Sequence, residues 1–210
     1  MKDIQLVHKK ILWEKSKVIY KYSPDENFQK DWEIKAGEWT YKDGYLIGKE
    51  DGNKGGILWF KKKFDKPVMI CFTASTVEPC TRDVNAVFCA SWDDEINDLG
   101  TSYVCGLNGW FADKAGIERS AGKGVQVFRS LTSSYKYTPG KEVRMIAGAV
   151  EGHSFMVVDG EIVAEHIEYK DYLEGGHIGF SPYCTILKIK DIEIREIAWE
   201  KCYEYYEPEF

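Results

Sequence analysis

The chain has 210 residues, 44% of them hydrophobic and 30% charged, which is the balance of an ordinary globular protein and excludes a largely disordered chain. All-β sandwiches of this length commonly fold as one unit, so we expect a single domain over 1–210 with its core at about 31–197. The formal net charge of −6 repels phosphate backbones, and no basic cluster is larger than the lysine run 61–63. We therefore expect no nucleic-acid partner.

The beginning of the chain lacks the long apolar run of a signal peptide or a membrane span. We therefore expect a cytoplasmic protein that does not associate with a membrane. Its six cysteines are scattered without a Cys-x-x-Cys pair, so we expect reduced and mostly buried thiols. A short N-terminal arm should precede the core, and the acidic, aromatic tail 203–210 should follow it at the surface.

Short runs of β-branched and aromatic residues, separated by Gly, Asp, Asn and Pro, predict strands through the first half of the chain. The first clear hairpin lies in 31–48, where Asp43-Gly44 separates two alternating segments. Further strands are expected at 56–63, 67–76, 84–92 and 101–107, with a polar stretch at 93–100.

The second half is more regular. Asp159-Gly160 predicts a tight turn between two strands, and the residues 169–173 predict one helical turn. The last strand should contain a register break near Lys190-Asp191. The strands are expected at 125–129, 142–149, 154–158, 161–166, 176–181 and 186–197. Many short strands without βαβ spacing predict an all-β fold, an antiparallel two-sheet β-sandwich.

Four segments carry a family likeness. They are DWEIKAGEWTYKDGYLIGK at 31–49, YVCGLNGWFADKAGIER at 103–119, HSFMVVDGEIVAEH at 153–166 and GGHIGFSPYCTILKIKDIEIREI at 175–197. Together they resemble concanavalin A-like jelly rolls, and more narrowly the bacterial keto-disaccharide hydrolase-like and YesU-like groups associated with sugar breakdown. The resemblance implies a jelly-roll sandwich and a partner that is an oligosaccharide or a small sugar.

The chain also departs from these relatives. Laminarinase-type glycosidases on this fold resemble one another in a Glu-x-Asp-x-x-Glu strand, which this sequence lacks. The Arg-rich central motif of the YesU type is not reproduced either. The resemblance therefore implies a fold and a class of ligand, and no catalytic set is carried over.

The first candidate site is acidic. Glycoside hydrolysis uses two carboxylates across the scissile bond, and Asp93 and Glu95 would share a face, ~6–7 Å apart at Cα, if their strand continued. Glu118 is the third candidate acid–base residue. The alternatives are a solvated acidic loop, or a calcium site built from Asp93, Asp94, Asn97 and Asp98. The spacing of these oxygens matches no strong ligand pattern, so we expect no metal and no cofactor.

The second candidate site is aromatic. Trp110 in a predicted turn, with Arg119 nearby, offers ring stacking and bidentate hydrogen bonds, which is the usual chemistry of a sugar or uronate site. Alternatively, Trp110 and Phe111 cap the core while Arg119 pairs with an acid. The predicted ligand-binding residues are Trp92, Tyr103, Asn108, Trp110, Arg119, Arg129 and His153.

Three functions follow from these two sites. The first is an intracellular glycoside hydrolase or lyase acting on small oligosaccharides, which needs a shielded carboxyl group with a raised pKa. The second is a non-catalytic, lectin-like carbohydrate-binding module that uses the same rings and arginines. The third is a sandwich used for protein assembly, for example in a homo-oligomer, in which the rings form the interface.

Overall fold

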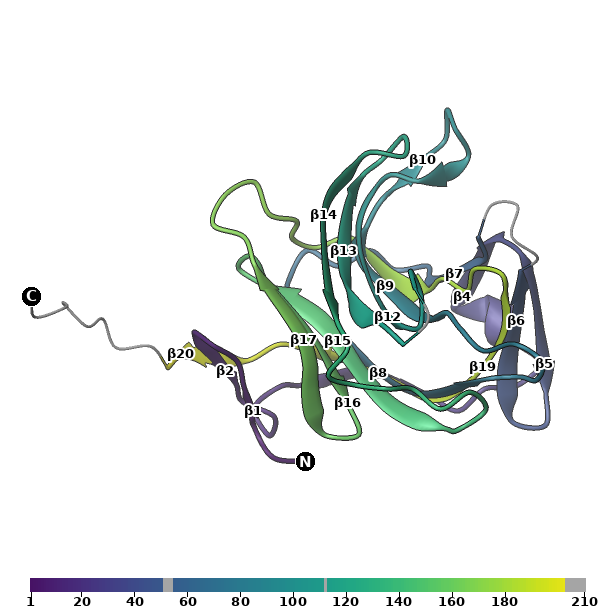
Figure 1. Ribbon diagram of the computed structural model, residues 1–210, viewed down its shortest axis with the longest axis horizontal. Coiled ribbons are helices and arrows are strands. Elements are labelled where there is room, and N and C mark those ends of the chain that lie inside the picture. Colours follow the sequence, from purple (N-terminus) through teal and green to yellow (C-terminus); the bar gives the residue numbers. More distant parts are fainter. Residues whose placement is uncertain (51–54, 112, 203–210) are drawn as a thin grey trace, which may run out of the picture.

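The computed structural model describes residues 1–50, 55–111 and 113–202, so the predicted tail 203–210 lies outside the described residues. The predicted all-β antiparallel sandwich is confirmed, because two large sheets enclose the main hydrophobic core (Figure 1). The described part of the chain contains no α-helix, and η1, Phe28–Lys30, is a single 3-10 turn. In the same ranges, no helix is long and apolar enough to cross a membrane.

The first sheet has seven strands in the order β14-β13-β12-β9-β18-β7-β4. Its strands are β4 Trp32–Ala36, β7 Ile57–Phe60, β9 Val84–Ala90, β12 Thr101–Leu107, β13 Ala115–Ala121, β14 Gln126–Thr132 and β18 His177–Phe180. Figure 1 shows β9, β12, β13 and β14 curving together toward the upper right of the view. A small hairpin of β10, Trp92–Asp93, and β11, Asp98–Leu99, lies at the tip of this curve.

The second sheet has eight strands, seven of them in the order β17-β16-β15-β8-β19-β6-β5, and β3, Val18–Tyr22, also pairs with β19. The remaining strands of this sheet are β5 Glu38–Lys42, β6 Tyr45–Glu50, β8 Val68–Thr76, β15 Val143–Val150, β16 His153–Val158, β17 Glu161–Ile167 and β19 Thr185–Glu196. A third, three-stranded sheet joins the two ends of the described chain. It consists of β1 Ile4–Gln5, β2 Lys9–Ile11 and β20 Trp199–Lys201.

Local turn chemistry accounts for the two hairpins expected from Asp-Gly pairs. Asp43 and Gly44 have φ angles of 51° and 84°, and Asp159 and Gly160 have 51° and 91°. Both residues of each turn are left-handed, as a two-residue hairpin turn that matches the strand twist requires. The register break predicted near Lys190 is also confirmed, because the pairing of β19 with β8 shifts there.

The helical turn predicted at 169–173 is wrong, because that segment is irregular. Asp171 has a left-handed φ of 52°, which a right-handed helical turn does not allow. Two contacts from the seven-stranded sheet hold the segment: Arg119 Nη2 donates to the Asp171 carbonyl at 2.5 Å, and the Leu173 N–H donates to the Tyr103 hydroxyl at 3.1 Å. Tertiary hydrogen bonds therefore override the local helical signal.

Strands β8, β15 and β16 of the eight-stranded sheet are buried on both faces. On β8, Ile70 and Phe72 point into the main core, while the alternate residues Met69 and Cys71 belong to a second apolar cluster on the outer face. The N-terminal arm supplies the cover for that outer face through Leu6, Ile11 and Trp13, which are all buried. The arm is thus part of the packed structure, in addition to the predicted core of 31–197.

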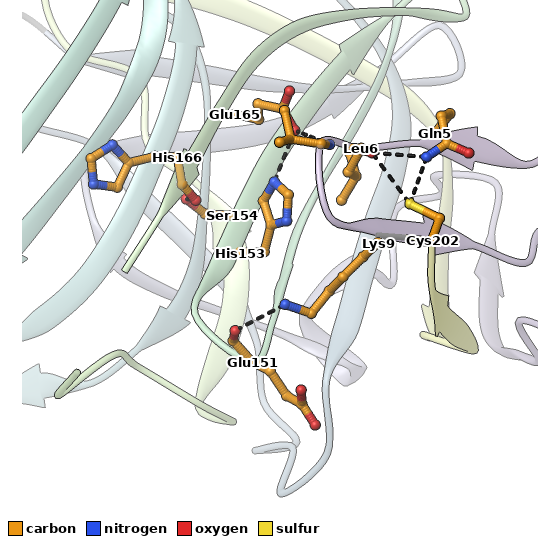
Figure 2. A network of polar contacts seen from close by, with 10 residues as sticks. Gln5, Leu6, Lys9, Glu151, His153, Ser154, Glu165, His166 and Cys202 are labelled. Atoms are coloured by element: carbon orange, nitrogen blue, oxygen red, sulfur yellow. Dashed lines mark hydrogen bonds and ion pairs between the residues drawn. The ribbon is translucent and has the colours of Figure 1, made fainter. Parts of the chain in front are cut away.

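Polar contacts fasten the arm at its edge (Figure 2). His153 on β16 lies with its Nε2 2.8 Å from Glu165 Oε2 on β17, and the same carboxylate oxygen accepts the Val7 N–H at 3.2 Å. The arm thus covers part of the outer face of the eight-stranded sheet. The candidate site lies on the outward face of the other sheet, which has seven strands.

The buried arm generates the first prediction. Ile11 is fully buried, so Ile11→Ala should lower the free energy of unfolding by about 2–4 kcal/mol, from lost burial and the cavity it leaves. Val7 lies in the same arm but is 57% exposed, so Val7→Ala should cost less than about 0.5 kcal/mol. Urea unfolding measures both. Equal losses in the two variants would contradict the packing of the arm on the sheet.

Candidate functional site

Strand alternation decides which side chains lie on the outward face of the seven-stranded sheet. On β9, Val84 and Ala86 point into the main core, so Asn85 points outward. On β13, Ile117 points into the core, so Glu118 points outward. The strands are in register, with Glu118 opposite Val104 on one side and opposite Arg129 on the other. The outward face therefore carries Asn85, Val104, Glu118 and Arg129.

Glu118, Arg129 and Trp110 form the first polar group on this face. Arg129 Nη2 and Nε both lie 2.5 Å from Glu118 Oε2. The Arg129 guanidinium also lies 5.9 Å from the centre of the Trp110 ring, within the range of a cation–π contact. The ion pair is partly open to solvent, because the two side chains are 33% and 18% exposed. The group thus presents a fixed charge pair beside a half-buried indole.

Asp83 and Asn85 form the second polar group, at the start of β9. Asn85 Nδ2 donates to Asp83 Oδ1 at 3.2 Å, and the two residues are 1% and 6% exposed. Within the described part of the chain, Asp83 Oδ2 and Asn85 Oδ1 have no hydrogen-bond partner. Gly106 makes room for this pair, because a Cβ there would lie 1.7 Å from Asn85 Oδ1. Two acceptor oxygens are therefore buried and unsatisfied, which is rare in folded proteins.

Burial raises the pKa of Asp83 to about 7, and the charge of Glu50 also raises it. The Asn85 hydrogen bond and the Arg82 guanidinium lower the pKa but do not offset burial. Arg82 is a weak partner, since its Nε lies 3.9 Å from Asp83 Oδ2 and its side chain is 52% exposed. Asp83 is thus a carboxyl group that changes charge near neutral pH. It was not among the residues predicted from the sequence.

Trp92 belongs to an aromatic cluster at the other end of the face. Its ring packs edge-on against Trp59, with centroids 5.7 Å apart, and Lys35 Nζ lies 4.6 Å from the Trp92 ring centre. His177 stacks on the other side of Trp59 at 4.1 Å. Trp59 Nε1 donates to Glu33 at 2.9 Å, which lowers the pKa of Glu33. This cluster fastens the β10–β11 hairpin to the sheet.

The structure places the predicted pair Asp93 and Glu95 on that hairpin. Asp93 Oδ1 accepts the Glu95 N–H at 3.0 Å, so the chain turns here and the two carboxylates do not alternate along a continuing strand. Glu95 is 81% exposed, with Lys123 Nζ 3.2 Å away. Both acids line an open hollow of about 650 Å³ at the tip of the sheet, which Glu118 does not line. The structure therefore does not bring the three predicted acids together.

Tyr103 and Arg119 lie on the inner side of the same sheet. Tyr103 is fully buried, and its hydroxyl donates to Glu168 at 2.5 Å. Arg119 forms an ion pair with the same carboxylate, with side chains 12% and 10% exposed. Arg119 therefore pairs with an acid, which was the alternative weighed against ligand binding, and both residues point away from the outward face.

Asn108 and His153 have separate positions. Asn108 is 9% exposed, turns the chain after β12 with a left-handed φ of 54°, and donates from Nδ2 to the Thr81 carbonyl at 3.0 Å. His153 is fully buried beneath the N-terminal arm, where burial lowers its pKa. Of the predicted ligand-binding residues, the structure brings Trp110 and Arg129 together, with Glu118 beside them.

Sequence reasoning missed Asp83 and Asn85. Their only sequence signal is an Asp-x-Asn spacing at the start of an apolar strand, which is also what an ordinary strand entry looks like. In the described ranges, no group of three or more His, Cys, Asp or Glu residues gathers closely enough to hold a metal ion.

The two arginines should differ in their effect on stability. Arg119→Met leaves Glu168 buried without its cation and should lower the free energy of unfolding by about 3–5 kcal/mol. Arg129→Met breaks a more solvated pair and should cost about 0–1 kcal/mol. Urea unfolding of the two variants tests the assignment of Arg119 to the interior. A loss for Arg129→Met as large as that for Arg119→Met would contradict it.

Asp83 should also make stability depend on pH. Its folded pKa of about 7 lies above the value of 3.8 for an unperturbed aspartate, so between these values the folded state holds a proton that the unfolded state releases. Stability should therefore fall as pH rises from about 4 to about 7, by roughly 4 kcal/mol at most. Asp83→Asn should remove this component. The measurement is urea unfolding at about pH 5 and about pH 8, and parallel profiles for the variant and the wild type would refute it.

Comparison with known proteins gives no match in sequence. No protein-family model matches the chain. No curated protein matches it either.

Solved structures do match. A protein of unknown function with a galectin-like fold from Bacillus subtilis has a TM-score of 0.69 at 15% identity, over 87% of this chain and 98% of its own. The carbohydrate-binding module CBM66 from Bacillus subtilis has a TM-score of 0.62 at 11% identity, over 79% and 95%. A native glycosidic hydrolase has a TM-score of 0.54 at 12% identity, over 86% and 97%. At these identities the likeness shows the fold, a galectin-like or concanavalin A-like sandwich.

Proposed function

We propose that the protein is a lectin-like carbohydrate-binding module, and that the outward face of the seven-stranded sheet is its binding surface. The observation that carries the proposal is the pair of unsatisfied oxygens, Asp83 Oδ2 and Asn85 Oδ1, on the same face as the Glu118–Arg129 ion pair. A sugar hydroxyl both donates and accepts hydrogen bonds. Two sugar hydroxyls would donate to the two acceptors at the start of β9, and a third would accept a hydrogen bond from the guanidinium.

The aromatic and apolar residues suit the rest of such a ligand. Trp110 offers an indole face beside Arg129, and Val104 lies between the two polar groups on β12. Sites for small ligands typically combine apolar surface with a few fixed polar groups, as this face does. The similarity of the fold to a carbohydrate-binding module supports this class of ligand. The narrower resemblance to the keto-disaccharide hydrolase-like and YesU-like groups favours a small oligosaccharide.

Geometry favours binding over the hydrolase or lyase predicted first. The shielded carboxyl that such an enzyme needs is best supplied by Asp83, and the predicted acid–base residue on this face is Glu118. Strand spacing of ~4.8 Å and a rise of ~3.3 Å per residue place their Cα atoms roughly 16 Å apart, two strands over and four residues along. Side chains stand roughly perpendicular to a sheet, so the two carboxyl groups are separated by a similar distance, whereas glycosidases hold theirs no more than ~9.5 Å apart. Glu118 is moreover held by Arg129.

The proposal is tested by isothermal titration calorimetry against a panel of plant and bacterial oligosaccharides, including uronate-containing and 3-keto forms. For a sugar that binds, Asn85→Ala and Arg129→Met should each weaken affinity at least about tenfold, since each removes a charge-assisted or buried hydrogen bond. Lys49→Met is the matched control, because Lys49 is exposed on the other sheet.

Mass spectrometry of the same mixtures distinguishes the alternatives. The binding module predicts unchanged sugars, whereas a new product lost in Asp83→Asn or Glu118→Gln would establish the hydrolase or lyase instead. Absence of any heat change across the panel would overturn the carbohydrate proposal for these ligands. The assembly alternative would then be examined by measuring the molecular mass of the protein in solution.

A further inference from the structure

A second hollow, of about 390 Å³, lies on another part of the molecule. It is formed where the three-stranded terminal sheet meets the end of β17 and the segment after it, and none of the outward-face residues lines it. Lys9 on β2 and Lys201 on β20 form one wall. Tyr169 and Tyr172 form another, and the acids of the lining are Glu151 and Glu168. We call it the Lys9 hollow.

The Lys9 ammonium in this wall has no carboxylate partner. Lys9 is only 9% exposed, and its Nζ donates to the backbone carbonyl of Glu151 at 3.3 Å and lies 5.2 Å from the Trp199 ring centre. In the described part of the chain no carboxylate oxygen lies within 4.0 Å of it. Figure 2 shows the Glu151 carboxylate pointing away from the ammonium. Buried charges in folded proteins are usually paired, and an anionic ligand in the hollow would pair with this one.

The pairing of β2 with β20 places a second lysine beside Lys9. Lys9 lies directly opposite Lys201 in the β2–β20 ladder, and like charges in that position repel each other. The adjacent pair on the other face of the same ladder, Lys10 and Glu200, has opposite charges, and Lys10 Nζ also lies 3.2 Å from Asp3. Burial and the charge of Lys201 lower the pKa of Lys9, while the charge of Glu151 raises it. Lys9 and Lys201 both line the hollow.

The lining charges specify the valence of the missing anion. Lys9 and Lys201 contribute two positive charges and Glu151 one negative charge, while the Glu168 charge is neutralised by Arg119. Among the described residues, the lysine and glutamate charges of the lining therefore sum to one positive charge. Ile167 and the two tyrosines supply apolar surface for the body of a ligand. The volume lies within the range of about 300–1,000 Å³ that is typical of small-molecule sites.

We infer that the Lys9 hollow binds a small organic monocarboxylate, with the carboxylate held between Lys9 and Lys201 and the body of the ligand against Tyr169 and Tyr172. A monoanion balances the excess charge, whereas a phosphate dianion would leave a net negative charge in the hollow. The inference is independent of the outward-face site, because the two share no residue.

Calorimetry tests this with benzoate and phenylacetate as carboxylate probes, and with benzamide and phenylacetamide as their neutral counterparts, because none of these is a sugar that the outward face would bind. At least one carboxylate should bind the wild type, more weakly as ionic strength rises. Its affinity should fall at least about tenfold in Lys9→Met and in Lys201→Met. Lys10→Met, on the opposite face of the same ladder, and Arg129→Met, in the outward-face site, should bind it as the wild type does.

A second readout guards against a folding defect. Lys9→Met removes a buried charge that has no counter-ion, so its Tm without ligand should be no lower than that of the wild type. If that variant does not fold, the exposed Lys201 carries the test alone through Lys201→Met. The inference is overturned if neither carboxylate binds, if the neutral probes bind equally well, if inorganic phosphate binds more tightly than both, or if Lys10→Met loses as much affinity as Lys9→Met.

Discussion

The eight-stranded sheet packs apolar side chains against the seven-stranded sheet on one face and against the N-terminal residues on the other. Strands β8, β15 and β16 are therefore mostly apolar, and β16 is buried along its whole length. These three strands have no open face on which to place a polar site. The rest of the arrangement follows from this, because the outward face of the seven-stranded sheet is left for polar residues, and the terminal sheet creates a hollow where it meets β17.

The buried charged side chains of this molecule fall into two kinds: those that pair with an opposite charge in the structure, and those that we assign to ligand binding. Arg119 is buried but neutralised by Glu168, and Arg195 is neutralised in the same way by Glu193. Asp83 and Lys9 are also buried, but the cation beside Asp83 is the half-exposed Arg82 at 3.9 Å, and no carboxylate of the described residues lies within 4.0 Å of Lys9. A buried ionisable group without a partner lowers stability, so its presence next to an open surface or a hollow is better explained by a ligand than by folding.

Much of the fold could be predicted from the sequence, because its signals are local. The Asp43-Gly44 and Asp159-Gly160 turns are specified by residues that tolerate positive φ, and alternation identified the two faces of β12 and β13. The site was harder, since alternation does not reveal which face looks inward. Glu118 and Arg119 are adjacent in the chain, and both residue types suit a binding site. In the structure Glu118 points outward and Arg119 points inward. The prediction that Asp93 and Glu95 share a face likewise assumed a strand that continues, whereas the chain turns at this point.

The sequence by itself determined the all-β class, the two Asp-Gly hairpins and the register break at Lys190, since each depends on backbone preferences and side-chain periodicity within a few residues. Only the tertiary structure decided that the N-terminal arm covers a sheet, that Arg119 pairs with Glu168 in the interior, that Asp83 is buried beside a half-exposed arginine, and that Lys9 is buried opposite another lysine. The physical reason is that burial and charge pairing are set by residues far apart in the chain. Lys9 and Lys201, near its two ends, become neighbours only when β2 pairs with β20.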